Sequence, residues 1–188
     1  MPNYCNYSMK VVGKETKVDE FIKIIQTDYE FDDNGKCNVD RHFWRVFEAD
    51  VTSEDIADGI KSATIYGYCA WSVYSCMFDG AHTYQGRHPN PEDGGTTLQR
   101  ESARLNLDIE VFSEESGCCF MEHYLIQNGK IKIDDCVDFY EYCTDDYETV
   151  EEMNDDLETD ITQEEFDYAN ENCDGYVRRG GMEWEFEI

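Results

Sequence analysis

Three carboxylates and an imidazole lie within ten residues of one another, at Glu114, Glu115, Glu122 and His123. Side chains of these types bind metals or act as general acids and bases. If the segment is a β-strand, Glu122 and His123 point to opposite faces of the sheet, so they cannot both face one pocket. We therefore favour structural roles for these residues. An enzyme that uses Glu115, Glu122 or His123 is kept as an alternative.

Nine cysteines are scattered along the chain, and no two of them form a C-x-x-C pair. Cys118 and Cys119 are adjacent, so a regular strand cannot turn both thiols toward one metal ion. A nucleophilic cysteine beside His123 has little support, because no basic neighbourhood or helix N-terminus is evident to stabilise a thiolate. The odd number and irregular spacing predict mostly reduced, buried thiols in a cytosolic protein.

Other chemical motifs are also missing from the sequence. The run Asp32-Asp33-Asn34-Gly35 lacks the alternating ligands and the closing Glu of a calcium loop, although adventitious divalent cations remain plausible on so acidic a chain. Glycine-rich phosphate loops and nucleophile elbows are absent. We expect no catalytic residues, no dedicated metal site and no cofactor.

Acidic side chains dominate the last third of the chain. From Asp134 to Ile188 there are 21 acidic and 2 basic residues, which accounts for −19 of the total net charge of −28. Such a field repels nucleic acids and anionic membranes and attracts basic proteins. The candidate partner-binding residues are the carboxylates of Glu148, Glu151, Glu152, Asp155, Asp156, Glu158, Asp160, Glu164, Glu165, Glu183, Glu185 and Glu187.

Sequence patterns predict that this acidic third is folded. Thr149 with Glu152, and Thr162 with Glu165, match the capping box that begins a helix. An apolar stripe at helical spacing runs between the two boxes. It consists of Val150, Met153, Leu157 and Ile161. Phe166, Tyr168 and Ala169 extend the apolar contacts into a second short helix. The ending MEWEFEI alternates strictly, which predicts a final strand that returns to a sheet.

The carboxylates of these elements can imitate a nucleic-acid backbone. On a strand, Glu183, Glu185 and Glu187 would repeat every ~6.7 Å on one face. On a helix, Glu151 and Asp155 would lie ~6 Å apart. Both spacings resemble the separation of successive phosphates along one nucleic-acid strand, which a basic channel is shaped to receive.

The first part of the chain alternates between strand and helix patterns. We expect a strand over residues 5–13, a helix capped by Thr16, a strand over residues 42–51, a short helix after Ser53 and a long strand over residues 62–78. A loop over residues 80–95 leads to a helix over residues 97–107 and three more strands, with a hairpin turn at Asn128-Gly129. These elements predict an α+β fold.

Two stretches of this region resemble a known family. They are MPNYCNYSMKVVG, followed by VDEFIKII, and the run from Ile109 to Gly129, IEVFSEESGCCFMEHYLIQNG, with Cys69-Ala70-Trp71-Ser72 between them. Both resemble the YubB-like ferredoxin-fold proteins of bacteriophages, plasmids and prophages, over about residues 1–135. The resemblance implies a ferredoxin-like antiparallel sheet with helices on one face and an origin in a mobile element. It implies no established activity.

The length and composition of the chain predict that it folds. With 188 residues, 40% of them hydrophobic and 14% aromatic, the chain is long enough and apolar enough to fold. No apolar run is long enough to span a bilayer, and the start does not read as a secretion signal. We expect a ferredoxin-like domain over residues 1–143 and an acidic helical lobe, closed by the final strand, over residues 144–188.

These observations favour a non-enzymatic inhibitor from a phage or mobile element. It would act in the cytoplasm of a bacterial host as an acidic decoy in the basic nucleic-acid channel of a host defence protein, with a CRISPR effector as the first candidate. Direct binding to nucleic acid or membrane is not expected. The alternative is a protein-interaction module that uses Tyr-rich loops around Tyr84 and a sheet face, with an acidity that serves only solubility.

Overall fold

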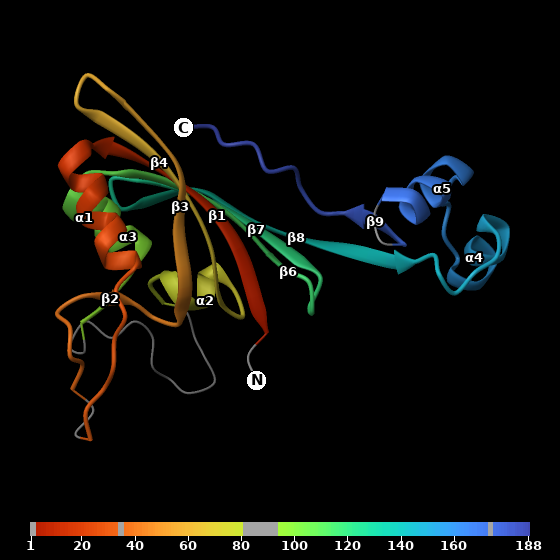
Figure 1. Ribbon diagram of the computed structural model, residues 1–188, viewed down its shortest axis with the longest axis horizontal. Helices are drawn as coiled ribbons and strands as arrows, with labels where there is room; N and C mark the ends of the chain where they lie inside the picture. Colours follow the sequence, from red (N-terminus) through yellow and green to blue (C-terminus); the bar gives the residue numbers. More distant parts are fainter. Residues whose placement is uncertain (1–2, 34–35, 81–93, 173–174) are drawn as a thin grey trace. The chain divides into compact units, whose positions relative to one another are not determined.

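The computed structural model describes residues 3–33, 36–80, 94–172 and 175–188 (Figure 1). In these residues, five helices accompany a mostly antiparallel sheet of seven strands, and the predicted α+β class is confirmed. The chain divides into two compact units. The first unit comprises Met1–Cys136 and Glu183–Ile188, and the second comprises Val137–Met182.

The sheet of the first unit is centred on β1. Across the sheet, the strands are β3 (Val46–Ala57), β4 (Ile60–Ala70), β1 (Tyr4–Lys14), β6 (Asp108–Glu115), β7 (Phe120–Gln127) and then β8 (Lys130–Cys143). β1 is antiparallel to both of its neighbours, with Met9 opposite Ile65 of β4 and Val111 of β6. All three side chains are fully buried. The core of the first unit therefore lies on the face of β1 that carries Met9.

Two helices cover this face (Figure 1). α1 (Glu15–Ile25) packs against β1, β3 and β4, and α3 (Leu98–Leu105) packs against β6 and β7. On α1, Val18, Phe21 and Ile25 are buried against the sheet, whereas Ile22 is only partly buried. A separate two-stranded parallel pair joins β2 (His42–Phe43) to β5 (Gly95–Thr96).

Several boundaries differ from the sequence predictions. α1 begins at Glu15 and has Lys14 at its N-cap, so the cap expected at Thr16 is wrong. The expected strand over residues 42–51 is broken, because Arg45 adopts a φ of 51° between β2 and β3. The helix expected after Ser53 is also wrong. β3 continues to Ala57 and turns into β4 through Asp58 and Gly59, which have φ values of 52° and 77°.

The long strand expected over residues 62–78 is only half correct. β4 ends at Ala70, and Ser72 then accepts a hydrogen bond from the backbone N–H of Ser75, which caps the short helix α2 (Val73–Met77). The predicted hairpin at Asn128-Gly129 is confirmed, because their φ values of 50° and 75° suit a two-residue turn between β7 and β8. Asn34 and Gly35 of the acidic run, and most of the loop expected over residues 80–95, including Tyr84, lie outside the described residues.

The second unit is built from a hairpin-like strand pair and two helices. The end of β8 pairs with β9 (Tyr176–Gly180), from Phe139 opposite Gly180 to Cys143 opposite Tyr176. The helices are α4 (Val150–Leu157) and α5 (Gln163–Asn172). A small core of its own holds the unit together. It contains Val150, Met153, Ile161, Phe166, Ala169 and Val177.

The C-terminal segment, residues 183–188, belongs to the first unit but forms no strand there, so the predicted final strand is wrong. The rings of Trp184 and Phe186 lie 6.1 Å and 5.5 Å from the ring of Phe112 on β6. The backbone N–H groups of Glu187 and Ile188 donate to the carboxylate of Glu110, at 2.7 Å and 3.2 Å. A buried carboxylate thus accepts from these amides in place of the carbonyl groups of a neighbouring strand.

Candidate functional site

Capping interactions fix the start of both helices in the second unit. Thr149 accepts a hydrogen bond from the backbone N–H of Glu152 at 3.2 Å, which confirms the predicted cap of α4. The Glu152 carboxylate accepts from the N–H of Glu148, one residue before the position expected in a capping box. The second box is complete, because Glu165 N–H donates to Thr162 Oγ1 at 3.3 Å and Thr162 N–H donates to Glu165 Oε2 at 2.8 Å.

The loop between the two helices is held by a residue that the sequence patterns did not reveal. The side-chain oxygen of Asn154 accepts from the hydroxyl of Thr159 and from the N–H of Ile161, at 2.7 Å and 2.9 Å. Its amide nitrogen donates to the carbonyl of Ile161 at 2.7 Å. One side chain in α4 therefore orders the turn that carries Glu158 and Asp160.

The apolar side of α4 is narrower than predicted. Val150, Met153 and Ile161 are buried as expected. Leu157 is 37% exposed, so its predicted place in the core is wrong. It is the last residue of α4, and the chain reverses direction directly after it at Glu158. In α5, Phe166 and Ala169 are buried, whereas Tyr168 is exposed.

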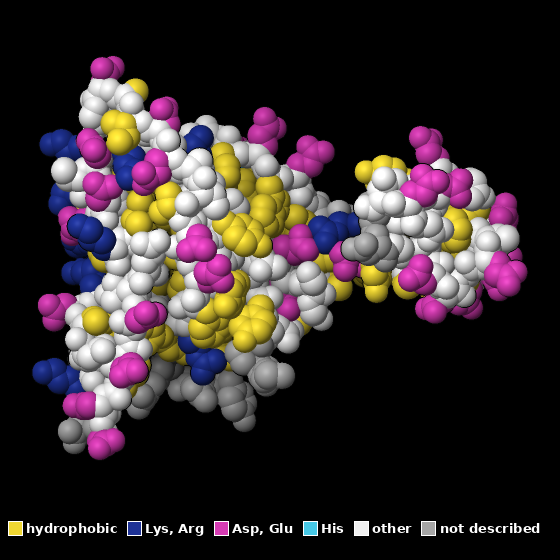
Figure 2. All heavy atoms as spheres, in the orientation of Figure 1, with side chains coloured by type: hydrophobic (Ala, Val, Ile, Leu, Met, Phe, Trp, Pro, Cys, Tyr) yellow, Lys and Arg dark blue, Asp and Glu magenta, His cyan; other side chains and the backbone are white. Residues whose placement is uncertain are grey.

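Eight of the candidate carboxylates are exposed on the second unit (Figure 2). They are Glu148, Glu151, Glu152, Asp155, Asp156, Glu158, Asp160 and Glu164. Asp155 and Asp156 lie in the last turn of α4, which has no basic residue, and a negative charge is unfavourable at that end of a helix. Glu158 adopts a left-handed φ of 54°, which a non-glycine residue adopts only at a cost. The unit therefore carries these charges at the expense of its own stability.

Two arginines are the only basic residues among residues 137–182 of the sequence, and both form ion pairs. Arg178 donates to Glu141 at 2.7 Å, and Arg179 donates to Glu165 at 2.8 Å. The hydrogen bond from Arg179, followed by those from Thr162, lowers the pKa of Glu165 to about 2. Glu165 is thus engaged within the fold, which distinguishes it from the other candidate carboxylates.

Most carboxylates of α4 and its flanks have no such counter-charge. Asp156 accepts a hydrogen bond from the hydroxyl of Tyr147 at 2.7 Å, and this bond raises the pKa of Tyr147 to about 12. Asp160 lies 3.9 Å from Arg179 but is almost fully exposed. Within the described part of the chain, five candidates of the second unit have a carboxylate with neither an ion pair to Lys, Arg or His nor a hydrogen bond of its own, unlike Glu152 and Asp156, which accept hydrogen bonds. They are Glu148, Glu151, Asp155, Glu158 and Glu164.

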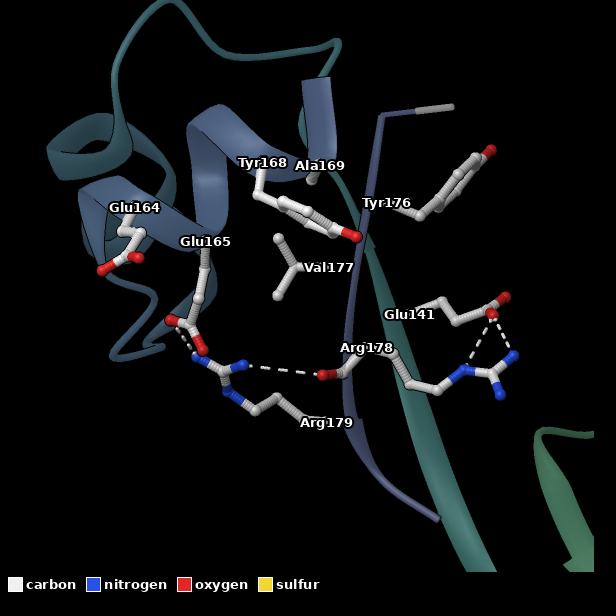
Figure 3. Close-up of a pocket in the computed structure, with 9 residues that line it drawn as sticks. All are labelled: Glu141, Glu164, Glu165, Tyr168, Ala169, Tyr176, Val177, Arg178 and Arg179. Carbon is white, nitrogen blue, oxygen red and sulfur yellow. Dashed lines mark hydrogen bonds and ion pairs between the residues drawn. The ribbon is translucent and has the colours of Figure 1, made fainter. Parts of the chain in front are cut away.

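A pocket of about 550 Å³ lies between α5 and β9 of the same unit (Figure 3). Ala169 and Val177 form its apolar part, and the ion-paired Arg178 and Arg179 lie along β9. The sequence did not predict this pocket, because the residues that line it come from three elements. They are Glu141, Glu164, Glu165, Tyr168, Ala169, Tyr176, Val177, Arg178 and Arg179.

The remaining candidates, Glu183, Glu185 and Glu187, belong to the first unit. All three are exposed, while Phe186 and Ile188 between and after them are half-buried. The alternation read from the sequence is therefore present in the exposure of the side chains from Glu185 to Ile188 but not at Trp184, which is 37% exposed. Because the segment is not a regular strand, the spacing of ~6.7 Å expected for its carboxylates no longer follows.

The structure separates the residues considered for an enzyme. Glu122 accepts from Ser113 Oγ at 2.7 Å and from the N–H of Val73 at 2.9 Å, and burial raises its pKa. His123 lies on the opposite face, with Nε2 2.8 Å from Glu110 and its ring stacked on Phe112. The predicted opposite orientation of Glu122 and His123 is confirmed, and each side chain has a structural partner of its own.

The third residue of this alternative, Glu115, is buried and holds the turn after β6. It accepts from the backbone N–H groups of Gly117 and Cys118, at 3.0 Å and 2.5 Å. The expectation of buried cysteines is correct for Cys5, Cys69 and Cys76, whereas Cys118 and Cys136 are exposed. In the described ranges, His, Cys, Asp and Glu form no group of three or more that is arranged to hold a metal ion.

No described helix is long and apolar enough to cross a membrane. Comparison of the chain with models of protein families, with curated proteins and with solved structures gave no match. The resemblance to the YubB-like proteins therefore stays a prediction. The second unit combines exposed, unpaired carboxylates with a pocket on one small folded unit.

Proposed function

We propose that the protein is a non-enzymatic inhibitor from a phage or another mobile element. It occupies the basic nucleic-acid channel of a host defence protein in the bacterial cytoplasm, and a CRISPR effector is the first partner to test. One observation carries the proposal. In the described residues, five exposed carboxylates on α4, beside it and at the start of α5 form neither an ion pair nor a hydrogen bond. Helix α4 itself is capped at its start and buried along one side.

The inhibitor would act by competition. Glu151 and Asp155 are four residues apart on α4, so their side chains are neighbours about 6 Å apart on one helix face. Lysine and arginine side chains that normally bind phosphates would pair with these carboxylates and exclude DNA or guide RNA. Association would be fast and would weaken with added salt, since long-range charge steers the encounter.

The connectivity of the first unit supports a ferredoxin-like core. Its main elements follow one another along the chain as β1, α1, β3, β4, α3 and β6, and the strands lie in the order β3, β4, β1, β6. A β-α-β-β-α-β unit of this kind is the ferredoxin-like motif. The motif agrees with the fold that the YubB-like resemblance implies. A shared fold does not by itself supply an activity, so the function rests on the acidic surface.

Charge reversal with a matched control tests the proposal. The protein carrying Glu151→Lys and Asp155→Lys is mixed with a purified, guide-loaded CRISPR effector from the host. Displacement of a labelled DNA duplex is followed by fluorescence anisotropy, and DNA cleavage is measured in parallel. The control carries Asp50→Lys and Asp55→Lys on β3, which changes the net charge by the same amount at exposed positions in the first unit.

We expect the α4 variant to lose inhibition by about tenfold or more and the control to retain it. The loss should be greatest at low salt, where charge interactions reach furthest. Equal inhibition by the unchanged protein and the α4 variant would sink the decoy mechanism. A lysate pull-down with the full chain, eluted by moderate salt, would identify a basic partner other than a CRISPR effector.

An exposed aromatic cluster on the first unit favours a second candidate, a protein-interaction module without a decoy function. The rings of Tyr4, Phe47 and Tyr68 lie 5.3 to 5.9 Å from one another, and Tyr4 and Phe47 are largely exposed. Hydrophobic side chains also gather over the strands of this unit in Figure 2. Under this alternative, Tyr4→Ala with Phe47→Ala abolishes the capture of a partner protein, and reversal of the α4 charges does not change that capture.

A further inference from the structure

The pocket of the second unit exposes two tyrosine rings on a surface that is otherwise strongly acidic. Tyr168 of α5 is 60% exposed, and Tyr176 of β9 is 49% exposed. Residues 137–182 contain 16 acidic and 2 basic residues, so the rings are surrounded by negative charge. An exposed aromatic ring in such a field attracts cations, because the face of the ring is itself electron-rich.

The ring of Tyr168 lies next to an apolar floor. The ring of Tyr168 extends from α5 toward β9 and lies close to Val177, while Tyr176 projects from the other side of β9 (Figure 3). Val177 and Ala169 belong to the small core of the unit. The pocket of about 550 Å³ is large enough for long side chains of a partner.

The unit already contains one example of the interaction that we infer. The guanidinium of Arg178 lies 4.3 Å from the centroid of the Phe139 ring and donates to the Glu141 carboxylate at 2.7 Å. A planar guanidinium can stack its face on an aromatic ring while the N–H groups at its edge donate to a carboxylate. This arrangement holds the end of β9 against β8.

The two exposed tyrosines offer the same combination to an external cation. Glu164 lines the pocket four residues before Tyr168 on α5, so it lies on the same face of the helix. The carboxylate of Asp145 lies against Gly175, the residue directly before Tyr176. Glu164 and Asp145 have no ion pair in the described residues, whereas Glu141 and Glu165 are already paired with the pocket's two arginines.

We infer that this pocket binds arginine side chains of a basic protein segment. One guanidinium stacks on Tyr168 and pairs with Glu164, and a second stacks on Tyr176 and pairs with Asp145. Arginine is favoured over lysine because only a planar guanidinium combines stacking with a bidentate carboxylate contact. The inference rests on the proposed function, since it names the side chain by which the basic partner is recognised.

Two peptide probes test the inference on the full-length protein. Binding of a nine-residue oligoarginine and a nine-residue oligolysine is measured by isothermal titration calorimetry at one ionic strength. A surface that offers charge alone should bind both peptides with similar affinity. We expect the unchanged protein to bind oligoarginine more tightly, by about two- to fivefold for each tyrosine ring, given the strength of exposed cation–π contacts.

The variant Tyr168→Ala with Tyr176→Ala should lose this preference and retain its affinity for oligolysine. Tyr140→Ala is the matched control, because Tyr140 is 59% exposed in the same unit and does not line the pocket. Circular dichroism checks that each variant is folded. An unchanged preference for oligoarginine in the double variant, or no preference in the unchanged protein, would overturn the pocket assignment.

The same measurements separate this inference from the proposed function. Glu151→Lys with Asp155→Lys should weaken the binding of both peptides by the same factor and leave the preference for oligoarginine unchanged. If charge reversal weakens peptide binding but the tyrosine variants leave the preference for oligoarginine unchanged, the proposed function is supported and the arginine pocket is contradicted. If neither peptide binds the unchanged protein, both proposals fail.

Discussion

Arg179 donates from Nη2 to Oε2 of Glu165 at 2.8 Å, and so joins β9 to the first turn of α5. Glu165 simultaneously completes the capping box with Thr162. One carboxylate therefore fixes both the start of a helix and its distance from the neighbouring strand. The pocket between α5 and β9 depends on this contact.

This contact predicts a pH dependence. The pKa of Glu165 is lowered from 4.5 to about 2, first by Arg179. A carboxylate with a depressed pKa contributes stability above its unfolded pKa and loses that contribution as the pH falls through its folded pKa. Arg179→Met should thus lower the thermal midpoint at pH 7, and the difference from the unchanged protein should shrink between about pH 4.5 and pH 2. Thermal unfolding followed by circular dichroism measures this.

Arg178→Met is the matched control for the pH series, since it removes an equal charge from the adjacent position in β9. A difference between Arg179→Met and the unchanged protein that stays constant from pH 7 to pH 2 would contradict the role assigned to Glu165.

Replacing Glu158 with glycine should stabilise the second unit. Glu158 is the C-cap of α4 with a φ of 54°, which glycine adopts without steric cost, and its charge opposes the helix dipole. The expected gain is about 1 kcal/mol, measured by chemical denaturation followed by circular dichroism. Glu151→Gly, in the first turn of the same helix, should destabilise by about 1 kcal/mol. Destabilisation by Glu158→Gly would show that the side chain has a structural role that outweighs its backbone strain.

The hydrogen bond that Thr149 accepts at the N-cap of α4 should contribute to stability, and two substitutions of Thr149 test this. Thr149→Ala removes the acceptor for the N–H of Glu152 and should cost about 1 kcal/mol. Thr149→Asp retains an acceptor and should preserve stability, because a negative charge is favourable at a helix N-terminus. Equilibrium denaturation compares the two variants, and equal losses for both would contradict a capping role.

Removal of residues 183–188 should destabilise the first unit. The buried carboxylate of Glu110 would lose the two backbone donors of Glu187 and Ile188, and the ring of Phe112 would be uncovered. A loss of about 2 kcal/mol or more is expected from the hydrogen bonds to the charged group alone. Denaturation and binding of a hydrophobic dye measure it. Glu183→Gln with Glu185→Gln, which leaves these contacts intact, should behave like the unchanged chain.

Sequence patterns correctly predicted the elements that are fixed by interactions between residues close together in the chain. Asn128-Gly129 sets its own turn, and Thr149 and Thr162 cap helices with partners three residues away. The helix expected after Ser53 failed because Asp58 and Gly59 close a β-hairpin that keeps the preceding residues in a strand. The final strand failed because a distant carboxylate, Glu110, accepts from its amides, which no pattern in MEWEFEI could indicate.

The candidate site was predictable in part for the same reason. The exposed carboxylates of α4 follow from helical spacing, and the structure places Glu151 and Asp155 on that helix as expected. The internal use of Glu165 depends on Arg179, fourteen residues away, and was not foreseen. The pocket was not foreseen either, because Tyr168 and Tyr176 are brought together only when β9 pairs with β8.

The second unit is an insertion, since the first unit supplies the chain both before residue 137 and after residue 182. When these 46 residues unfold, their ends stay anchored, so they become a closed loop with fewer conformations than a free tail. A unit of this size has a small core and would be marginal by itself. Its host domain thus lowers the entropic penalty of folding, which lets a peptide segment with 16 acidic residues keep an ordered shape. Excised from the chain, the same segment would lose that advantage.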